Sequence, residues 1–355
     1  MKLIDLGYEE WQSAITQQTE KEKPYLFQTV QRAVPDMDGF IKFLASIELN
    51  LKEYFLPRPS IIIVEVEEEE ISTSDPQIKI IHQSSFNPWG IEDNSIQSII
   101  VSPPYWNLKK YEIPDVIIGG NLSCKHKFVK KGKYGSFCTS CNAWEGQYGW
   151  EPTPELYIDH TLLWCQDAWR SLKKDGIFFL NFGDSYLDKC QLLIPERIAI
   201  ALQDDGWILR NRIVWLKGNA TPHPVKDRFS NKSEIIFFFV KSQKYVFNLD
   251  SVREPHKTDC NNWNRNKLGK NPGDVWIFNT QRAKLGHCAM MPEKLVKQLI
   301  LCSTRVGDTV LDPFCASATT LMVANQLGRT AYGIDLGYEE VQEQRLSGVQ
   351  RRIKC

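Results

Sequence analysis

The sequence predicts an α/β fold: a doubly wound, mostly parallel sheet with helices on both faces. From residue 78 onward, short apolar runs alternate with helix-like segments, as they do when crossover helices connect parallel strands. Several runs are apolar without interruption, which is expected for strands that are covered on both faces. The strand candidates are residues 78–81, 96–101, 177–182, 208–215, 235–240, 309–311 and 331–334.

Three helices between these strands can be placed from the residues at their ends. The clearest spans residues 155–173, because Thr153 suits its N-cap, Pro154 suits its first turn and Asp175-Gly176 ends it. Its apolar residues recur at spacings of four and three and predict one buried stripe, which comprises Ile158, Leu162, Cys165, Trp169 and Leu172. A second helix opens at Pro292 and a third follows Ser317, ending near Gly328.

The first part of the chain differs from the rest. Residues 1–77 are predicted to form an accessory segment, with a helix-like stretch that two prolines close and an acidic run at 65–70. This segment carries no residues that suggest chemistry. Residues 78–355 form the predicted main domain, and a chain of 355 residues has room for both.

The composition limits the possible classes of protein. Hydrophobic residues make up 42% and charged residues 24%, which suffices for a full core. Lys+Arg and Asp+Glu both number 43, so any basic surface for nucleic acid must be local. The lysine-rich stretches 125–133 and 257–270 are candidates for such a surface, or are simply solvated faces. No apolar run is long enough to cross a bilayer, and the scattered cysteines fit reduced thiols, so a cytoplasmic protein is expected.

The most informative motif is Ser102-Pro103-Pro104-Tyr105, which directly follows the predicted strand 96–101. Ligands of open α/β sheets bind beyond the carboxyl ends of the strands, where this turn lies. Two consecutive prolines fix the backbone and remove two N–H donors, so carbonyl groups are left free to accept hydrogen bonds. Ser102 adds a hydroxyl and Tyr105 an aromatic face. A rigid turn with a packed aromatic ring is the structural alternative.

Such a turn suits an exocyclic base amine as substrate. The amine nitrogen is a poor nucleophile because its lone pair is delocalised into the base. Hydrogen bonds from its N–H groups to a prearranged hydroxyl and carbonyl favour the sp3-like nitrogen that forms during attack. An aromatic side chain can stack on a base that has rotated out of the duplex. This chemistry requires no covalent nucleophile.

A second motif lies far downstream, at residues 310–320. It consists of a predicted strand, a turn of small residues and the start of a helix. Small residues let the backbone approach a ligand closely, and a helix N-terminus offers free N–H groups. Asp335 closes the next strand, where a carboxylate can accept hydrogen bonds from ribose hydroxyls. Taken alone, the motif fits any nucleotide-type site or a plain tight connection.

Together the two motifs resemble the amino-methyltransferase family that modifies DNA at cytosine N4 or adenine N6, over roughly residues 78–345. Residues 102–105 are similar to its catalytic motif, 311–320 to its cofactor loop and 333–335 to its acidic strand end. Because the catalytic motif precedes the cofactor loop, the order is the permuted one called the β class. Further similarities lie at 182–186 and at His287, Ala289, Pro292, Trp215, Lys217, Asn219, Arg228, Glu234 and Lys241.

The resemblance implies a seven-stranded sheet with one antiparallel strand, and methyl transfer from S-adenosyl-L-methionine directly to the amine. It implies that Ser102 and the Pro103 carbonyl bind the amine, that Pro104 belongs to the same turn, and that Tyr105 stacks on the base. The residues implied to bind the cofactor are Asp312, Phe314, Ala316, Ser317, Thr319, Thr320, Asp335, His287 and Pro292. The implied partner is double-stranded DNA, and a companion restriction endonuclease is a further partner to test.

Cytosine N4 is the first choice of target, because a serine opens the catalytic motif and the order is permuted; adenine N6 is the alternative. Two departures leave a degenerate DNA-binding relative without cofactor as another alternative. Ala316 and Ala318 stand where the family usually has glycine, and in a left-handed backbone each Cβ would cost about 1–2 kcal/mol. His82-Gln83-Ser84-Ser85 stands where relatives commonly have a Gly-Asp pair.

The catalytic turn bears differently on two other kinds of methyltransferase. A cytosine-C5 enzyme is disfavoured, because it needs a cysteine after the first proline and this chain has Pro104 there. An RNA or protein-amide methyltransferase stays open, because a Pro-Pro-Tyr turn can hold any planar amine or amide.

A metal site is predicted in the insert at residues 118–150. Its candidate ligands are Cys124, His126, Cys138 and Cys141, and three thiols with one imidazole can close a tetrahedral zinc shell. The predicted role is structural, holding a loop beside the target base, whereas the alternative is unrelated cysteines in a loop. The asparagine-rich loop 253–273 is a possible target-recognition element, because amide side chains can bind base edges.

Overall fold

The computed structural model describes residues 77–121, 123–131, 134–220, 224–256, 266–281 and 290–352. The helical segment predicted within 1–77 lies outside these residues, and so do His287 and part of the loop 253–273.

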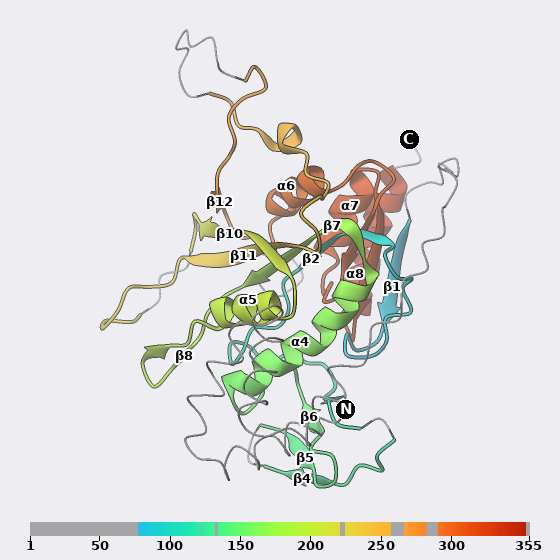
Figure 1. Ribbon diagram of the computed structural model, residues 1–355, viewed down its shortest axis with the longest axis vertical. Helices are drawn as coiled ribbons and strands as arrows, with labels where there is room; N and C mark the ends of the chain where they lie inside the picture. Colours follow the sequence, from blue (N-terminus) through green and yellow to red (C-terminus); the bar gives the residue numbers. More distant parts are fainter. Residues whose placement is uncertain are drawn as a thin grey trace, which may run out of the picture. The chain divides into compact units, whose positions relative to one another are not determined.

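An eight-stranded sheet lies at the centre of the described residues (Figure 1), in the order β1-β14-β13-β2-β7-β11-β10-β12. β11 runs antiparallel to both neighbours, whereas every other neighbouring pair is parallel. The strands are β1 Ile78–His82, β2 Ile96–Val101, β7 Leu172–Phe182, β10 Ile208–Lys217, β11 Ser233–Val240, β12 Val275–Phe278, β13 Thr309–Asp312 and β14 Thr330–Asp335. The predicted doubly wound, mostly parallel sheet with one antiparallel strand is confirmed.

The sheet has one strand more than the seven expected. The additional strand is β12, which pairs in parallel with β10 at the edge of the sheet. Trp276 is buried, but its neighbours Val275 and Ile277 are 56% and 66% exposed. The run Val275–Phe278 is apolar throughout but only four residues long, and a run this short does not by its pattern alone identify a strand of the sheet.

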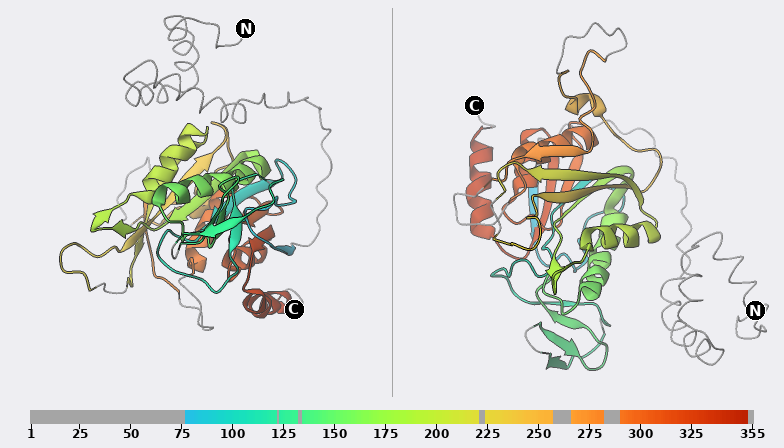
Figure 2. Two further views of the ribbon diagram at one scale, coloured as in Figure 1. Left: turned by 90° about the horizontal axis from the view of Figure 1, so that it is seen from below. Right: turned by 90° about the vertical axis from the view of Figure 1, so that its left-hand side faces the viewer.

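Helices cover both faces of the sheet, because alternate strand residues enter two separate apolar cores. α4 and α5 pack with Ile99 and Phe178 in one core, and α6 and α7 pack with Ile100 and Phe179 in the other (Figure 2). The helices are α4 Pro154–Ser171, α5 Ile194–Asp204, α6 Glu293–Ser303, α7 Thr319–Gln326, α8 Glu339–Arg352 and the 3-10 helix η2 Leu249–Val252. No helix in the described ranges is both long and apolar enough to cross a membrane.

Helix α4 begins as predicted but ends earlier. Thr153 caps it, since the Thr153 hydroxyl accepts a hydrogen bond from the Leu156 N–H at 3.2 Å. Leu172 already has an extended backbone and pairs with β2, so Asp175-Gly176 lies inside β7 instead of ending the helix. Gly176 serves a close approach, because a Cβ there would lie 2.9 Å from the carbonyl oxygen of Gln97.

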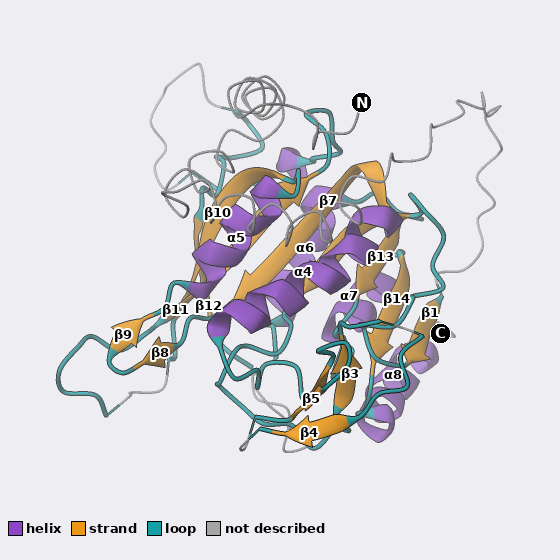
Figure 3. Ribbon diagram, turned by 60° about the horizontal axis from the view of Figure 1, so that its bottom comes forward, coloured by secondary structure: helices purple, strands orange, loops and turns teal. Residues whose placement is uncertain are grey.

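The chain between β2 and α4 folds into a separate four-stranded sheet in the order β3-β6-β5-β4. Figure 3 shows it beyond the carboxyl ends of the main parallel strands. Its strands are β3 Val116–Ile118, β4 Phe128–Lys130, β5 Ser136–Cys138 and β6 Trp144–Gly146, and a small hairpin, β8 Tyr186–Leu187 with β9 Cys190–Gln191, follows β7. The insert predicted at 118–150 therefore lies at the edge of the main sheet where ligands of α/β folds bind.

Candidate active site and Cys/His cluster

Four neighbouring strands end at one edge of the main sheet and bring the two sequence motifs together. In the order β14-β13-β2-β7, Asp335 closes β14, Asp312 closes β13 and Ser102 follows β2. One pocket at this edge is lined by residues of both motifs: Ser102 and Pro104 from the first, and Phe314, Ala316 and Asp335 from the second. Pro103 is buried and Tyr105 is half-buried, and neither is among the residues that line this pocket.

Ser102 and Tyr105 belong to one hydrogen-bond network. Ser102 Oγ lies 2.8 Å from the Tyr105 hydroxyl, which donates to Glu234 Oε2, also at 2.8 Å. Asn181 Nδ2 donates to the Tyr105 hydroxyl at 2.7 Å, to Glu234 Oε2 at 2.8 Å and to Ser102 Oγ at 3.3 Å. Lys217 Nζ completes the network by pairing with Glu234 Oε1. Strands β7, β10 and β11 therefore hold the side chains of the predicted catalytic motif.

The surroundings of Tyr105 keep its phenol protonated. Burial raises the pKa of Tyr105 well above its ordinary value, and the negative charge of Glu234 raises it further. The ring packs on Phe182, with 5.9 Å between the ring centroids. It also packs on Gly183, where a Cβ would lie 3.0 Å from the ring. The side chain is therefore fixed with its hydroxyl directed at Glu234.

The turn itself is supported by helix α4 and by the loop that follows the small sheet. The Pro104 carbonyl accepts a hydrogen bond from the Tyr157 hydroxyl at 2.7 Å. Gly149 has a φ of +92°, and a Cβ there would lie 3.1 Å from the Tyr105 carbonyl oxygen. The Gly149 N–H donates to the buried carboxylate of Glu151, whose Oε1 lies 3.0 Å from His160 Nδ1. Burial raises the pKa of Glu151, although the His160 hydrogen bond opposes this.

Aromatic packing joins the two motifs across the pocket. Tyr148 stacks on Phe314 with 5.6 Å between centroids, and on Tyr157 with 5.1 Å. Trp164 meets Phe314 edge-on at 5.2 Å. Tyr105 and Phe314 pack against the same apolar core, so they lie on the same face of the sheet.

The predicted cofactor loop is held by its polar side chains. Asp312 accepts hydrogen bonds from the Thr320 hydroxyl at 2.7 Å and from the Phe314 N–H at 3.1 Å. Burial outweighs these bonds and raises the pKa of Asp312 to about 7. Ser317, Thr319, Thr320 and Asp312 are buried and do not line the pocket, so they support the loop from behind. Pro292 precedes α6 and also does not line the pocket.

Asp335 lies on the pocket wall, as a ribose-binding carboxylate should. Its oxygens accept hydrogen bonds from the Ala316 N–H at 2.6 Å and the Gly337 N–H at 3.0 Å. Burial raises the pKa of Asp335, and these two N–H donors oppose the rise. A carboxylate has about four lone-pair sites, so Asp335 can accept further hydrogen bonds from a ligand.

Both alanines that replace family glycines have left-handed backbones. The φ angles are 40° at Ala316 and 59° at Ala318, which is the N-cap residue of α7. The sequence predicted strain at these alanines only if their backbones were left-handed, and both are. Each Cβ therefore adds about 1–2 kcal/mol of local strain to the loop.

Three side chains whose contacts the sequence did not predict bind the same loop. Arg345 of α8 donates to the carbonyl and the hydroxyl oxygens of Ser317, both at 2.9 Å. Gln342 Nε2 donates to the Ala316 carbonyl at 2.8 Å, and Ser85 Oγ donates to the Pro313 carbonyl. Ser84 and Ser85, in the segment 82–85 where the resemblance implies a Gly-Asp pair, also line the pocket. No local pattern marks such contacts, because each depends on tertiary packing.

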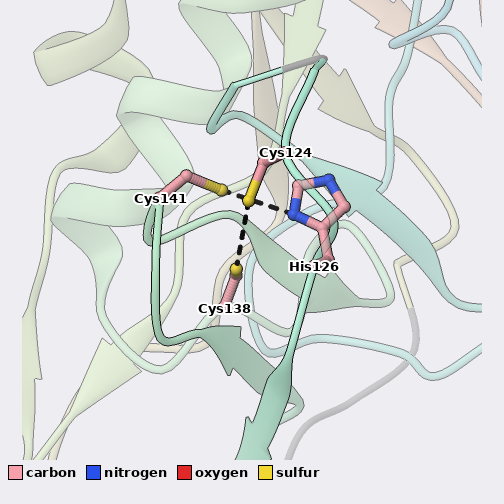
Figure 4. A group of neighbouring side chains, drawn as sticks. All are labelled: Cys124, His126, Cys138 and Cys141. Carbon is pink, nitrogen blue, oxygen red and sulfur yellow. Dashed lines mark hydrogen bonds between the residues drawn. The ribbon is translucent and has the colours of Figure 1, made fainter.

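The four predicted metal ligands converge on one point of the small sheet (Figure 4). Cys124 Sγ lies 3.8 Å from Cys138 Sγ, and Cys141 Sγ lies 3.3 Å from His126 Nδ1. One ligand atom from each residue lies within 4.8 Å of the others. Sulfur atoms bound tetrahedrally at about 2.3 Å from one zinc ion stand about 3.8 Å apart, so the spacing fits zinc.

The thiols of this cluster differ in acidity. Burial disfavours the Cys138 thiolate, but N–H groups of Ser140 and Cys141 and the His126 side chain outweigh it and lower the pKa of Cys138 to about 5. Backbone N–H groups also lower the pKa of Cys141, whereas burial and the neighbouring thiols raise that of Cys124 to about 11.

Comparison with known proteins decides the family. A family model described as DNA methylase, of the N6/N4 type, matches residues 96–345, which include both pocket motifs and the Cys/His cluster. The chain belongs to the N6/N4 DNA methylase family. This confirms the family resemblance that was inferred from residues 102–105, 311–320 and 333–335.

Named relatives of this DNA methylase are Type II methyltransferases. M.Cfr9I of Citrobacter freundii is 30% identical over 294 residues, which cover 74% of this chain and 85% of the relative. M.SmaI of Serratia marcescens is 30% identical over 280 residues, covering 70% and 83%. Among solved structures, the cytosine-N4-specific PvuII DNA methyltransferase aligns with a TM-score of 0.55 at 18% identity, covering 79% of this chain and 93% of that one. At that identity the likeness shows the fold.

Proposed function

We propose that this DNA methylase transfers a methyl group from S-adenosyl-L-methionine to cytosine N4 in double-stranded DNA. The observation that carries the proposal is the shared pocket, in which Ser102 of the catalytic motif faces the same space as Phe314, Ala316 and Asp335 of the cofactor motif. Bound S-adenosyl-L-methionine supplies an electrophilic methyl group on a sulfonium sulfur. Asp335 binds its ribose hydroxyls, and Phe314 offers the pocket an apolar face.

The catalytic turn holds the target amine. Ser102 Oγ and the Pro103 carbonyl accept hydrogen bonds from the two amine hydrogens, which orients the nitrogen lone pair toward the methyl group. The rigid Pro-Pro turn, the Tyr157 hydrogen bond and the close contact of Gly149 fix these acceptors in advance. The ring of Tyr105 is proposed to stack on the rotated base.

Side chains around the pocket suit DNA as the partner. Lys125, Lys127, Lys130 and Lys131 are exposed on the small sheet, at the same edge as the catalytic turn. Phe229 is 97% exposed beside the basic residues Arg228 and Lys232. Exposed aromatic and basic side chains together suit stacking on bases and contact with phosphates.

A companion restriction endonuclease is proposed from the Type II relatives.

Zinc is the proposed occupant of the Cys/His cluster. Three sulfur atoms and one imidazole nitrogen complete a tetrahedral shell and leave no coordination position for a substrate. Zinc there would tie together the strands of the small sheet, and with them the Gly149 loop that supports the catalytic turn.

Two alternatives are addressed by one pair of measurements on the full chain. Calorimetric titration with S-adenosyl-L-methionine should show binding; the left-handed alanines favour the alternative of a DNA-binding relative that has lost the cofactor, which would show none. Sequencing DNA from expressing cells by a method that separates N4-methylcytosine from N6-methyladenine should reveal N4-methylcytosine. Methylation of adenine alone would replace the cytosine assignment, and no methylated base would contradict the enzyme proposal.

A further inference from the structure

Ser102, Tyr105 and Glu234 form a continuous chain of hydrogen bonds that joins two pockets. Ser102 lines the pocket that contains Asp335 and Phe314. Glu234 lines a second pocket of about 430 Å³ together with Asp184, Arg212 and Arg228. The Tyr105 hydroxyl lies between them, 2.8 Å from Ser102 Oγ and 2.8 Å from Glu234 Oε2.

The directions of these hydrogen bonds follow from counting protons. A phenol carries one proton, and the Tyr105 hydroxyl donates it to the Glu234 carboxylate. The short contact between Ser102 and Tyr105 must then have Ser102 as the donor. With its only proton committed to Tyr105, Ser102 Oγ can only accept a hydrogen bond from a ligand in its pocket. A base amine, which offers N–H groups, matches that requirement.

Neighbouring groups hold this arrangement in place. The two hydrogens of Asn181 Nδ2 serve the Tyr105 hydroxyl at 2.7 Å and Glu234 Oε2 at 2.8 Å, and Ser102 Oγ lies farther away at 3.3 Å, so Asn181 holds the Tyr105–Glu234 pair in place from the interior. Lys217 pairs with the other oxygen of the Glu234 carboxylate, so the charge on Glu234 is balanced while Oε2 remains available to Tyr105. The side chain of Glu234 is 12% exposed, so it reaches solvent on the side of the second pocket.

We propose that Glu234 accepts the proton that the base amine loses on methylation, and that the proton travels through Ser102 and Tyr105. The inference rests on the proposed function. As the nitrogen–methyl bond forms, the carbon–sulfur bond breaks and its electron pair stays on sulfur. The amine N–H proton passes to Ser102 Oγ, the Ser102 proton passes to the Tyr105 oxygen, and the Tyr105 proton passes to Glu234 Oε2. Glu234 then releases this proton to solvent in the second pocket.

The relay uses the hydroxyl of Tyr105, whereas stacking on the base uses its ring, and one substitution separates the two roles. Tyr105→Phe keeps the ring and breaks the relay at its centre. Glu234→Gln keeps the shape of the side chain but removes the carboxylate that would take up the proton. Glu234→Asp keeps a carboxylate. The matched controls are Tyr245→Phe and Glu155→Gln, whose side chains bond to Arg210 and Arg197, touch neither the network nor the two pockets, and leave the relay intact.

The test measures single-turnover methylation of DNA at saturating S-adenosyl-L-methionine, with cofactor and DNA affinities measured separately. Tyr105→Phe and Glu234→Gln should each slow transfer by about 100-fold, as expected for loss of proton transfer. The double variant should be no slower than either single variant, because both interrupt one path. Both affinities should stay within about threefold of wild type. Glu234→Asp should recover part of the lost rate, and the controls should behave as wild type.

The possible failures of the two proposals are distinguishable. A wild-type chain that makes no methylated base overturns the proposed function and the relay together. An active wild type with Tyr105→Phe within threefold of its rate overturns the relay alone. Losses that multiply in the double variant, or that appear as weakened DNA or cofactor binding, also overturn the relay and assign Glu234 a structural role.

Discussion

The ring of Tyr148 stacks on the ring of Phe314, with 5.6 Å between centroids and 26° between planes. Tyr148 follows the small sheet, and Phe314 lies in the cofactor motif that follows β13. This contact ties the insert that supports the catalytic turn to the loop that is proposed to bind the cofactor. Changes on either side should therefore affect the other.

Replacing Tyr148 by alanine should destabilise the protein and weaken cofactor binding together. The side chain is buried between Phe314 and Tyr157, and the loss of such a ring costs about 3–5 kcal/mol. Thermal unfolding and calorimetric titration measure the two effects. Tyr148→Phe is the control: it keeps the ring and loses only the hydroxyl contacts to Thr161 and Trp164. An unchanged cofactor affinity in Tyr148→Ala would show that the stack does not shape the site.

Replacing Ala316 by glycine should relieve strain in the cofactor loop. Its φ of 40° is costly for a residue with a Cβ, and its side chain is only partly buried, so the gain is expected to be about 1 kcal/mol. Cofactor affinity should rise by up to about tenfold, if the strain changes on binding. Ala168→Gly, inside α4, is the opposite control and should destabilise by about 1 kcal/mol. A lower melting temperature for Ala316→Gly would contradict the strain argument.

The buried carboxyl of Asp312 should make stability depend on pH. Its pKa is raised from an ordinary value of 3.8 to about 7, so the folded chain binds this proton more tightly than the unfolded chain does. Stability should therefore fall as the pH rises from about 4 to about 7, by up to roughly 4 kcal/mol.

Asp312→Asn removes this titration and isolates its effect. The melting temperature of the variant minus that of wild type should be larger at pH 8 than at pH 5. Asp227→Asn, which changes an exposed carboxylate paired with Lys189, should show no such increase. The same difference at both pH values would mean that Asp312 ionises in the folded protein as readily as in the unfolded one.

Elemental analysis should find one zinc ion per chain, held by the Cys/His cluster. Cys138→Ser should lose most of the zinc and lower the melting temperature, because one of four ligands is removed. A chelator should have the same effect on the wild type. Cys190→Ser, at an exposed cysteine outside the cluster, should retain the metal. If wild-type protein purified without chelators contained no zinc, the assignment of zinc to this cluster would be wrong.

The sequence predicted the central strands from local pattern, and it predicted the meeting of the two motifs from their positions at strand ends and from the family resemblance. Continuous apolar runs mark covered strands, and residues such as Ser102 and Asp335 directly follow or close them. β12 and the end of α4 were harder to predict from the sequence. Pairing with β10 makes the short segment 275–278 an edge strand, and pairing of Leu172 with β2 ends the helix early. The contacts of Asn181, Arg345 and Ser85 join distant segments, so no spacing in the sequence reveals them.

The left-handed alanines show an intermediate case. The glycines that the family resemblance implies at these positions indicate which backbone angles the loop requires, but only the structure shows that Ala316 and Ala318 adopt them. The hydroxyl of Tyr105 shows the reverse case. The sequence motif explains its ring, whereas its bond to Glu234, 129 residues away, follows from the packing of β11 beside β7.

A crystal structure of the protein bound to S-adenosyl-L-methionine measures the central relationship directly. The expected result is the ribose at Asp335, the cofactor beside Phe314 and Ala316, and the methyl group directed into the space in front of Ser102. A cofactor bound elsewhere, or one whose methyl group points away from the turn at residues 102–105, would contradict it.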